Sequence, residues 1–217
     1  MIIPSKKELK KIDLNNYNRK EHYEFFKDFH EPFFGVAVEI DCTEAYQYCR
    51  LNHLSFYQFY TYQILKAVNE VKELRYRIID HEIYDVGKLH VSATVLRTDK
   101  TFGFSRILYE DDFGSFSRGM KEEIEKVKNT EGLNLYADQY DVIHFSATPW
   151  LRFSSLSHSR HFKTGDSIPK VAVGKTLEEN GRITFPVSIH VNHALVDGYH
   201  LSLVFEKLEQ LLNTPAH

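Results

Sequence analysis

The chain has 217 residues, 42% of them apolar, and a formal net charge of −3. A chain of this size can bury a sizeable core, and we expect one domain over residues 1–217. Its lysines and arginines are scattered and form no basic stripe, which argues against a nucleic acid partner. No apolar run reaches the length of a membrane helix, and charges follow Met1 too early for a signal peptide, so we expect a cytoplasmic protein.

The hydrophobic periodicity predicts strands and helices that alternate irregularly along the chain. A helix is expected over Thr43–Leu51, and a longer one follows, with Ser55 as its N-cap and Glu73 at its end. Two further helices are expected over Phe113–Asn129 and Tyr199–Leu212. Strands are expected over Gly35–Ile40, Tyr76–Asp80, His90–Arg97, Phe102–Leu108, Val142–Ser146, Lys170–Thr176 and Arg182–Val191. Without a Gly-rich phosphate-binding motif, this order favours neither a dinucleotide-binding fold nor a P-loop.

The two cysteines, Cys42 and Cys49, are seven residues apart in a segment that is interpreted as helix from Asp41 to Leu51. Side chains at this spacing share a face but lie about two turns from each other. A disulfide would need a distorted backbone at that distance. We therefore expect reduced, structural thiols.

The most informative segment is Ser188–His200, where an alternating strand leads into His193, an Asp-Gly pair and the start of a helix. A general base needs a pKa near neutral pH and a fixed orientation, and a histidine at the end of a strand can provide both. Asp197 and Gly198 favour a tight turn followed by a helix start. For this motif alone, a corner that buries a polar histidine is an equally good interpretation.

A metal site is an alternative use of these histidines, with His190, His193 and His200 as candidate ligands. His190 and His193 would face opposite sides of a strand, because they are three residues apart. No Cys-x-x-Cys or His-Glu-x-x-His motif accompanies them. We therefore expect no metal site, and we expect His158 and His161 to lie in a loop.

Three separate segments together resemble the chloramphenicol acetyltransferase family of CoA-dependent acyltransferases. They are Tyr17–Phe26, which contains Arg19, then Phe145–Trp150, which contains Ser146, and the His-x-x-x-Asp-Gly motif that begins at His193. They occur in the family's order and at similar separations across nearly the whole chain. The resemblance implies an α/β fold, a two-layer α/β sandwich with a mostly antiparallel or mixed sheet. It also implies a homotrimer with active sites at the subunit interfaces.

The resemblance implies transfer of an acetyl group from acetyl-CoA to a hydroxyl of chloramphenicol or a related small alcohol, by direct attack in a ternary complex. No cofactor would be bound permanently. His193 would remove the hydroxyl proton and Ser146 would stabilise the oxyanion, the two roles that such an attack requires. Arg19 and Asp197 would form a buried ion pair that supports the site, and a backbone carbonyl would fix the imidazole tautomer. A triad-like role for Asp197 is the alternative interpretation.

The resemblance further implies an acceptor pocket that is rich in aromatic rings and a CoA site near the serine. The expected pocket residues are Phe25, Phe26, His30, Phe34, Phe102 and Phe104, and the expected CoA contacts are Ser146, Lys175 and Thr176. The sequence departs from the family pattern at Pro32, Phe34, Phe104, Thr176 and Ser55. We therefore expect the chemistry to be preserved more closely than the specificity, with a small, partly aromatic or apolar alcohol as acceptor and with chloramphenicol acetylated poorly.

Two other functions share the same motif. One is the acyl-transfer core of a 2-oxo-acid dehydrogenase complex, which transfers acyl groups to a lipoyl thiol instead of an alcohol. The other is a non-catalytic small-molecule-binding homologue that retains the fold. An acetyl-CoA assay with a panel of acceptors would distinguish the three.

Overall fold

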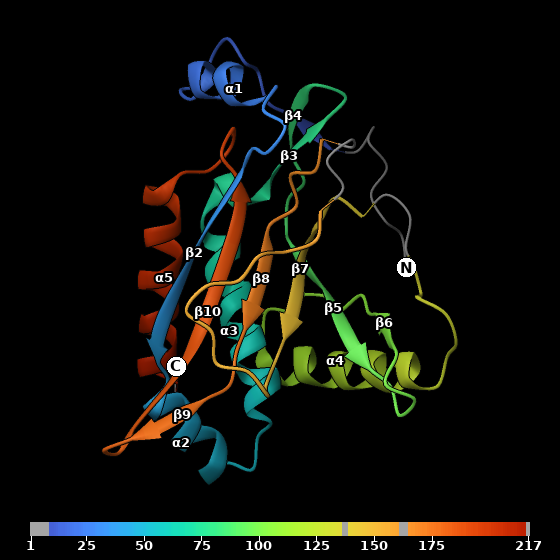
Figure 1. Cartoon of the computed structure of the whole chain (residues 1–217), viewed down its shortest axis with the longest axis vertical. Helices are drawn as coiled ribbons and strands as arrows, with labels where there is room; N and C mark the ends of the chain where they lie inside the picture. The colour runs from blue at the N-terminus through green and yellow to red at the C-terminus, as the bar shows by residue number, and fades with distance from the viewer. Residues whose placement is uncertain (1–8, 136–138, 161–164, 216–217) are drawn as a thin grey trace.

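A mixed β-sheet forms the centre of the computed structural model, which describes residues 9–135, 139–160 and 165–215 (Figure 1). Seven strands of the described residues belong to this sheet, with the order β2-β10-β8-β7-β5-β6 and with β9 paired to β10. They are β2 (Phe33–Asp41), β5 (His90–Leu96), β6 (Phe102–Phe104), β7 (Val142–Ala147), β8 (Lys170–Val173), β9 (Leu177–Glu179) and β10 (Arg182–Asn192). β5, β7 and β8 are mutually parallel, whereas β10 runs antiparallel to both of its neighbours, β8 and β2.

The helices form a second layer behind the sheet in Figure 1, and the fold is the expected mixed α/β sandwich. They are α2 (Thr43–Leu51), α3 (Phe56–Glu70), α4 (Phe113–Lys128) and α5 (Gly198–Asn213). A short helix, α1 (Lys20–Phe26), lies near the end of β10. Beside it is a small second sheet of three strands, in the order β1 (Lys10–Lys11), β4 (Glu82–Asp85) and β3 (Tyr76–Ile79). A 3-10 turn, Lys72–Arg75, directly precedes β3. None of the helices in the described residues combines the length and apolarity that a membrane crossing needs.

The two faces of the sheet differ in polarity, because successive side chains of a strand point to opposite sides. Val187 and Ile189 of β10, with Val171 of β8, are fully buried in the core that the sheet forms with the helices. The alternate residues form polar rows across the other face. The register aligns His190, Lys170, His144 and Ser92 in one row, and Ser188, Ala172 and Ser146 in the next.

Most elements predicted from the sequence are confirmed, with shifted ends. Ser55 caps α3 as expected, but the helix ends at Glu70 and not at Glu73. The strand predicted over Phe102–Leu108 is wrong beyond Phe104, since Ile107 makes only an isolated bridge to Val91. α1, β1, β4 and β9 were not predicted. β9 forms a hairpin with β10 through an Asn-Gly turn at positive φ, a recognised hairpin signal in the sequence.

The cysteines are free thiols in the buried core, as expected. Cys42 precedes α2 as its N-cap, so the interpretation of Asp41 as helical was wrong, and Asp41 belongs to β2. Burial raises the pKa of Cys49 to about 11 and also raises that of Cys42. Both thiols are therefore protonated and unreactive at neutral pH.

Gly35 of β2 pairs with His190 of β10, and the His190 ring leaves no room for a side chain at position 35. A Cβ atom at this position would lie 2.3 Å from Cδ2 of His190, so the imidazole occupies the space of the missing side chain. The Gly35→Ala variant should therefore be destabilised, by about 1–3 kcal/mol, because the ring has to shift.

Gly119 provides the matched control, since a Cβ there meets nothing within 4 Å and the residue lies on an exposed turn of α4. Gly119→Ala should be stabilised by about 0.5–1 kcal/mol through its higher helix propensity. Urea unfolding of both variants measures the contrast. Equal stability of Gly35→Ala and the wild type would show that the ring does not need this space.

Candidate active site

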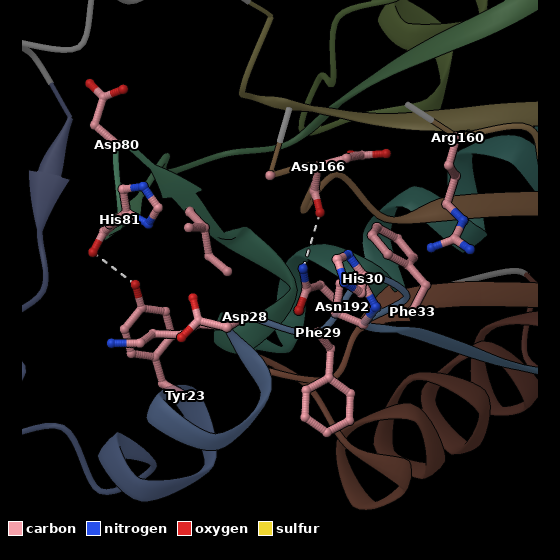
Figure 2. A pocket seen from close by; sticks show the side chains of 14 residues that line it. Tyr23, Asp28, Phe29, His30, Phe33, Asp80, His81, Arg160, Asp166 and Asn192 are labelled. Atoms are coloured by element: carbon pink, nitrogen blue, oxygen red, sulfur yellow. Dashed lines mark hydrogen bonds between the residues drawn. The ribbon is translucent and has the colours of Figure 1, made fainter. Parts of the chain in front are cut away.

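His193 lies in the tight turn that connects β10 to α5, and backbone hydrogen bonds fix its position. Its N–H donates to the Pro32 carbonyl at 2.8 Å. The Asn192 side chain accepts from the Ala194 N–H at 3.0 Å and donates to the Asp166 carbonyl at 3.0 Å, the bond drawn in Figure 2. The turn is therefore tied both to the segment before β2 and to the segment before β8.

The imidazole of His193 is held in one orientation. Its Nδ1 lies 3.1 Å from the Val196 carbonyl oxygen, which can only accept, so this geometry assigns the proton to Nδ1. The ring is stacked on Phe26, with centroids 4.3 Å apart, and tilted against Phe34 at 4.5 Å. Nε2 consequently carries the lone pair, which is the tautomer that a general base needs.

Asp197 supports this turn from the start of α5. Its side chain is the N-cap, accepting from the N–H groups of Tyr199 and His200, and it forms an ion pair with the buried guanidinium of Arg19. The imidazole of His200 lies between the carboxylates of Asp197, at 2.8 Å, and Glu73, at 3.8 Å. Asp197 thus contacts Arg19 and α5, while the Val196 carbonyl occupies Nδ1 of His193. This arrangement does not favour the triad-like alternative.

The same contacts determine the ionisation of Asp197. Partial burial disfavours its charged form, but the hydrogen bond from Arg19 and the nearby charges of His200 and Arg19 outweigh that effect and lower the pKa of the carboxyl. Arg19 is 7% exposed, so loss of Asp197 would leave a buried cation without its carboxylate.

Ser146 lies near the end of β7, on the polar face of the sheet, beside a cavity of about 640 Å³. Ser92 and Thr94 of β5 contribute to the wall, and His158 and Ser159 enter from a loop. The remaining lining residues are Phe104, Leu135, Gln139, Tyr140, His144, Phe145, Ile168, Lys170 and Val171.

The expected pocket residues are divided between separate places. Phe104 lines the Ser146 cavity, and Phe102 packs edge-on against it at 5.5 Å. Phe26 and Phe34 contact His193, and Phe25 packs on Phe26 at 4.9 Å.

His30 lines a different cavity, of about 400 Å³, which opens between α1 and the turn that connects β3 to β4. Figure 2 shows His30, Phe33 and Asn192 close together, with Asp166 and Arg160 on the same side of the cavity. Tyr23 anchors α1 on the other side through a hydrogen bond to the His81 carbonyl, at 2.8 Å.

The expected CoA contacts lie at the Ser146 end of the sheet. Ser146 pairs with Ala172 of β8, and Lys175 and Thr176 follow a few residues beyond in the same direction. The Lys175 N–H donates to the Leu151 carbonyl at 2.8 Å, and its side chain is exposed. A ligand along this edge can therefore reach Ser146 and Lys175 together.

His193 and Ser146 lie far apart within one chain. Ser146 is in the same row as Ser188, two strands away, and His193 follows Ser188 by five residues along β10. Strand spacing and rise per residue place the two residues roughly 18 Å apart. A base and an oxyanion donor must both contact one reacting centre, so a single chain does not bring this pair together.

Three further polar residues were not identified as site residues from the sequence, and His200 was considered there only as a metal ligand. His144, Lys170 and His158 line the Ser146 cavity, and His200 supports Asp197. His144 could have been predicted as a neighbour of the site, because it is two residues from Ser146 on β7 and therefore points to the same face of the sheet. In the part of the chain that the structure describes, no group of three His, Cys, Asp or Glu side chains could hold a metal ion. His158 lies in a loop as expected, whereas His161 is outside the described residues.

Comparisons with known proteins first define the class of fold. The solved dihydrolipoamide acetyltransferase of Azotobacter vinelandii superposes with a TM-score of 0.65 over 90% of this chain and 86% of that chain, at 14% identity. At that identity the likeness shows a shared fold only.

The particular family follows from closer relatives. The chain belongs to the chloramphenicol acetyltransferase family, whose model matches residues 7–209. It is 28% identical to the chloramphenicol acetyltransferase of Bacillus pumilus, over 94% of this chain and 93% of the relative. It is also 28% identical to chloramphenicol acetyltransferase 3 of Escherichia coli, over 94% and 97%. A solved chloramphenicol acetyltransferase, 30% identical, superposes with a TM-score of 0.88 over 94% of this chain and 99% of that chain.

The Arg19–Asp197 pair can be tested by a double-mutant cycle with Arg19→Met and Asp197→Asn. Each single change should cost about 2–4 kcal/mol, slightly less than for a fully buried pair because Asp197 is partly exposed. The double variant should cost clearly less than the sum, since neither partner is left unpaired. Additive losses in urea unfolding at pH 7 would mean that the two residues act independently.

The lowered pKa of Asp197 adds a pH dependence to the same prediction. A carboxyl with a depressed folded-state pKa stabilises the protein above its unfolded pKa, about 3.9, and this stability is lost as the pH falls through the folded value. The stability difference between the wild type and Asp197→Asn should therefore be present at pH 5 and shrink as the pH falls below about 4. A difference that does not change down to pH 3 would argue against an ionised Asp197 in the pair.

Proposed function

We propose that the protein transfers an acetyl group from acetyl-CoA to a hydroxyl group of a small acceptor, with His193 as general base. The observation that carries this proposal is the geometry of the imidazole, whose Nδ1 bonds Val196 while Phe26 and Phe34 hold the ring. Chloramphenicol is the first acceptor to test, because it is in the names of the relatives.

In the proposed reaction, acetyl-CoA and the acceptor are bound together. Nε2 of His193 takes the hydroxyl proton as the acceptor oxygen attacks the thioester carbonyl carbon. The carbonyl oxygen becomes an oxyanion, to which the Ser146 hydroxyl donates a hydrogen bond. Collapse of the intermediate breaks the carbon–sulfur bond, and the CoA thiolate leaves and recovers the proton from His193. Lys175 and Thr176, at the Ser146 end of the sheet, are assigned to the CoA side.

We further propose that each active site forms between two copies of the chain in a homotrimer. The separation of roughly 18 Å between His193 and Ser146 supports this, because the register of one chain keeps them apart. A head-to-tail interface that repeats in a ring would place His193 of one copy against Ser146 of the next. Large apolar side chains are exposed at both ends, with Phe25 65% exposed near His193 and Leu135 75% exposed at the Ser146 cavity.

Acetylation assays with His193→Ala and Ser146→Ala test the chemistry. With acetyl-CoA and chloramphenicol, His193→Ala should lower the rate by about 10²–10⁴-fold, the usual contribution of a general base. Ser146→Ala should lower it by about 10²–10³-fold, as expected for one oxyanion donor. His22→Ala, at an exposed position of α1, is the control for a histidine outside the site.

The acetylated products are measured by chromatography, with circular dichroism to confirm that each variant is folded. The panel contains chloramphenicol, simple primary alcohols and dihydrolipoamide. Acetylation of dihydrolipoamide alone would favour the 2-oxo-acid dehydrogenase alternative. Acceptor binding without any acetylation would favour a non-catalytic homologue and contradict the proposal.

A further inference from the structure

We propose that the cavity beside Ser146 selects an acceptor with a neutral hydrogen-bonding oxygen substituent, a hydroxyl or carbonyl, about 7 Å from the hydroxyl that is acetylated. This inference rests on the proposed function and defines its substrate class. It refines the sequence-based expectation of a small, partly aromatic or apolar acceptor, because three polar side chains, His144, Lys170 and His158, form part of the cavity wall.

Lys170 is the buried anchor of this wall. Its side chain is 3% exposed, and its ammonium group is 2.6 Å from the Asp166 carboxylate and 3.4 Å from the Ile168 carbonyl. Burial lowers the pKa of Lys170, and the neighbouring Asp166 opposes that shift. Because the Asp166 carboxylate balances its charge, Lys170 can hold His144 in place without requiring an anionic ligand.

The position of Lys170 determines which tautomer of His144 faces the cavity. The ammonium nitrogen lies 3.4 Å from Nδ1 of His144, and an ammonium group can only donate. The positive charge therefore favours the tautomer with its lone pair on Nδ1 and its proton on Nε2. The surrounding protein atoms and Lys170 lower the pKa of His144 to about 4, so the ring is neutral at pH 7 and Nε2–H is a hydrogen-bond donor.

His158 contributes a second polar group from the loop above the sheet. Its ring packs edge-on against His190, with centroids 5.0 Å apart. Within the described residues, its buried Nε2 has no hydrogen-bond partner. A buried polar atom without a partner costs about 1–3 kcal/mol, so a ligand oxygen that reaches Nε2 would be favoured over an apolar group. Burial and the neighbouring His190 lower the pKa of His158 to about 4, so this ring is also neutral.

The spacing along β7 sets the distance between the reacting hydroxyl and the selected oxygen. Ser146 and His144 are two residues apart on one face, which corresponds to about 7 Å along the strand. An acceptor whose hydroxyl is acetylated beside Ser146 extends over His144. An apolar group there would desolvate the imidazole N–H without replacing its hydrogen bond, whereas an oxygen would replace it.

The test uses 2-phenylethanols that differ only in the para substituent, which lies at about the required distance from the hydroxyl. A para hydroxyl and a para methyl group have similar size, so they form the matched pair, and a para carboxylate is the charged comparison. The wild type should prefer the hydroxyl compound over the methyl compound by about tenfold in kcat/KM for acetylation, the effect of one hydrogen bond.

His144→Phe should reduce this preference to about one, because the donor is removed and the ring is kept. His144→Gln should retain it, since its amide can donate from nearly the position of Nε2. His22→Phe on the exposed side of α1 is the control and should retain the wild-type ratio. A wild-type enzyme that prefers methyl or accepts both equally, or an unchanged ratio in His144→Phe, would overturn the inference.

Calorimetric binding of the same compounds separates this inference from the proposed function. Preferential binding of the hydroxyl compound without any acetylation would contradict the acetyl transfer but support the selectivity of the cavity. Acetylation of chloramphenicol with no hydroxyl preference would support the transfer and overturn the selectivity. A preference for the carboxylate alone would show an unbalanced positive charge at the wall and overturn the assignment of a neutral oxygen.

Discussion

The antiparallel pairing of β10 with β8, next to the parallel pairing of β8 with β7, determines the position of every candidate catalytic side chain. Strands that run in opposite directions end at opposite edges of a sheet. His193, just after β10, is therefore separated from Ser146, near the end of β7. Under the proposed function, a complete site forms only when a second copy of the chain supplies the missing residue.

The contacts around His193 differ in kind from those around the Ser146 cavity. At the His193 end, the Val196 carbonyl fixes the imidazole tautomer, aromatic rings hold its plane, and Arg19 with Asp197 fixes the helix that follows. At the Ser146 end, the ion-paired Lys170 favours one tautomer of the neutral His144 imidazole beside a cavity. Under the proposals above, the first arrangement would activate the hydroxyl of the acceptor, whereas the second would discriminate between acceptors.

Sequence patterns predicted what depends on local order along the chain. The strand before His193, the cap at Ser55 and the helix after Asp197 follow from alternation, capping residues and apolar spacing. The separation of His193 from Ser146 could not be predicted from periodicity, because it depends on strand order. Nor could the density of phenylalanines show that Phe26 and Phe34 hold an imidazole while Phe104 lines a cavity. Those assignments depend on contacts between distant segments.

The shared active site is tested most directly by mixing two inactive chains. His193→Ala and Ser146→Ala chains with different affinity tags are expressed together, and assemblies that contain both tags are purified. In a ring of three with both variants, about one third of the interfaces combine an intact His193 with an intact Ser146. The account predicts acetyl transfer at about one third of the wild-type rate, far above either variant alone. Mixed assemblies no more active than the separate variants would contradict a site formed between chains.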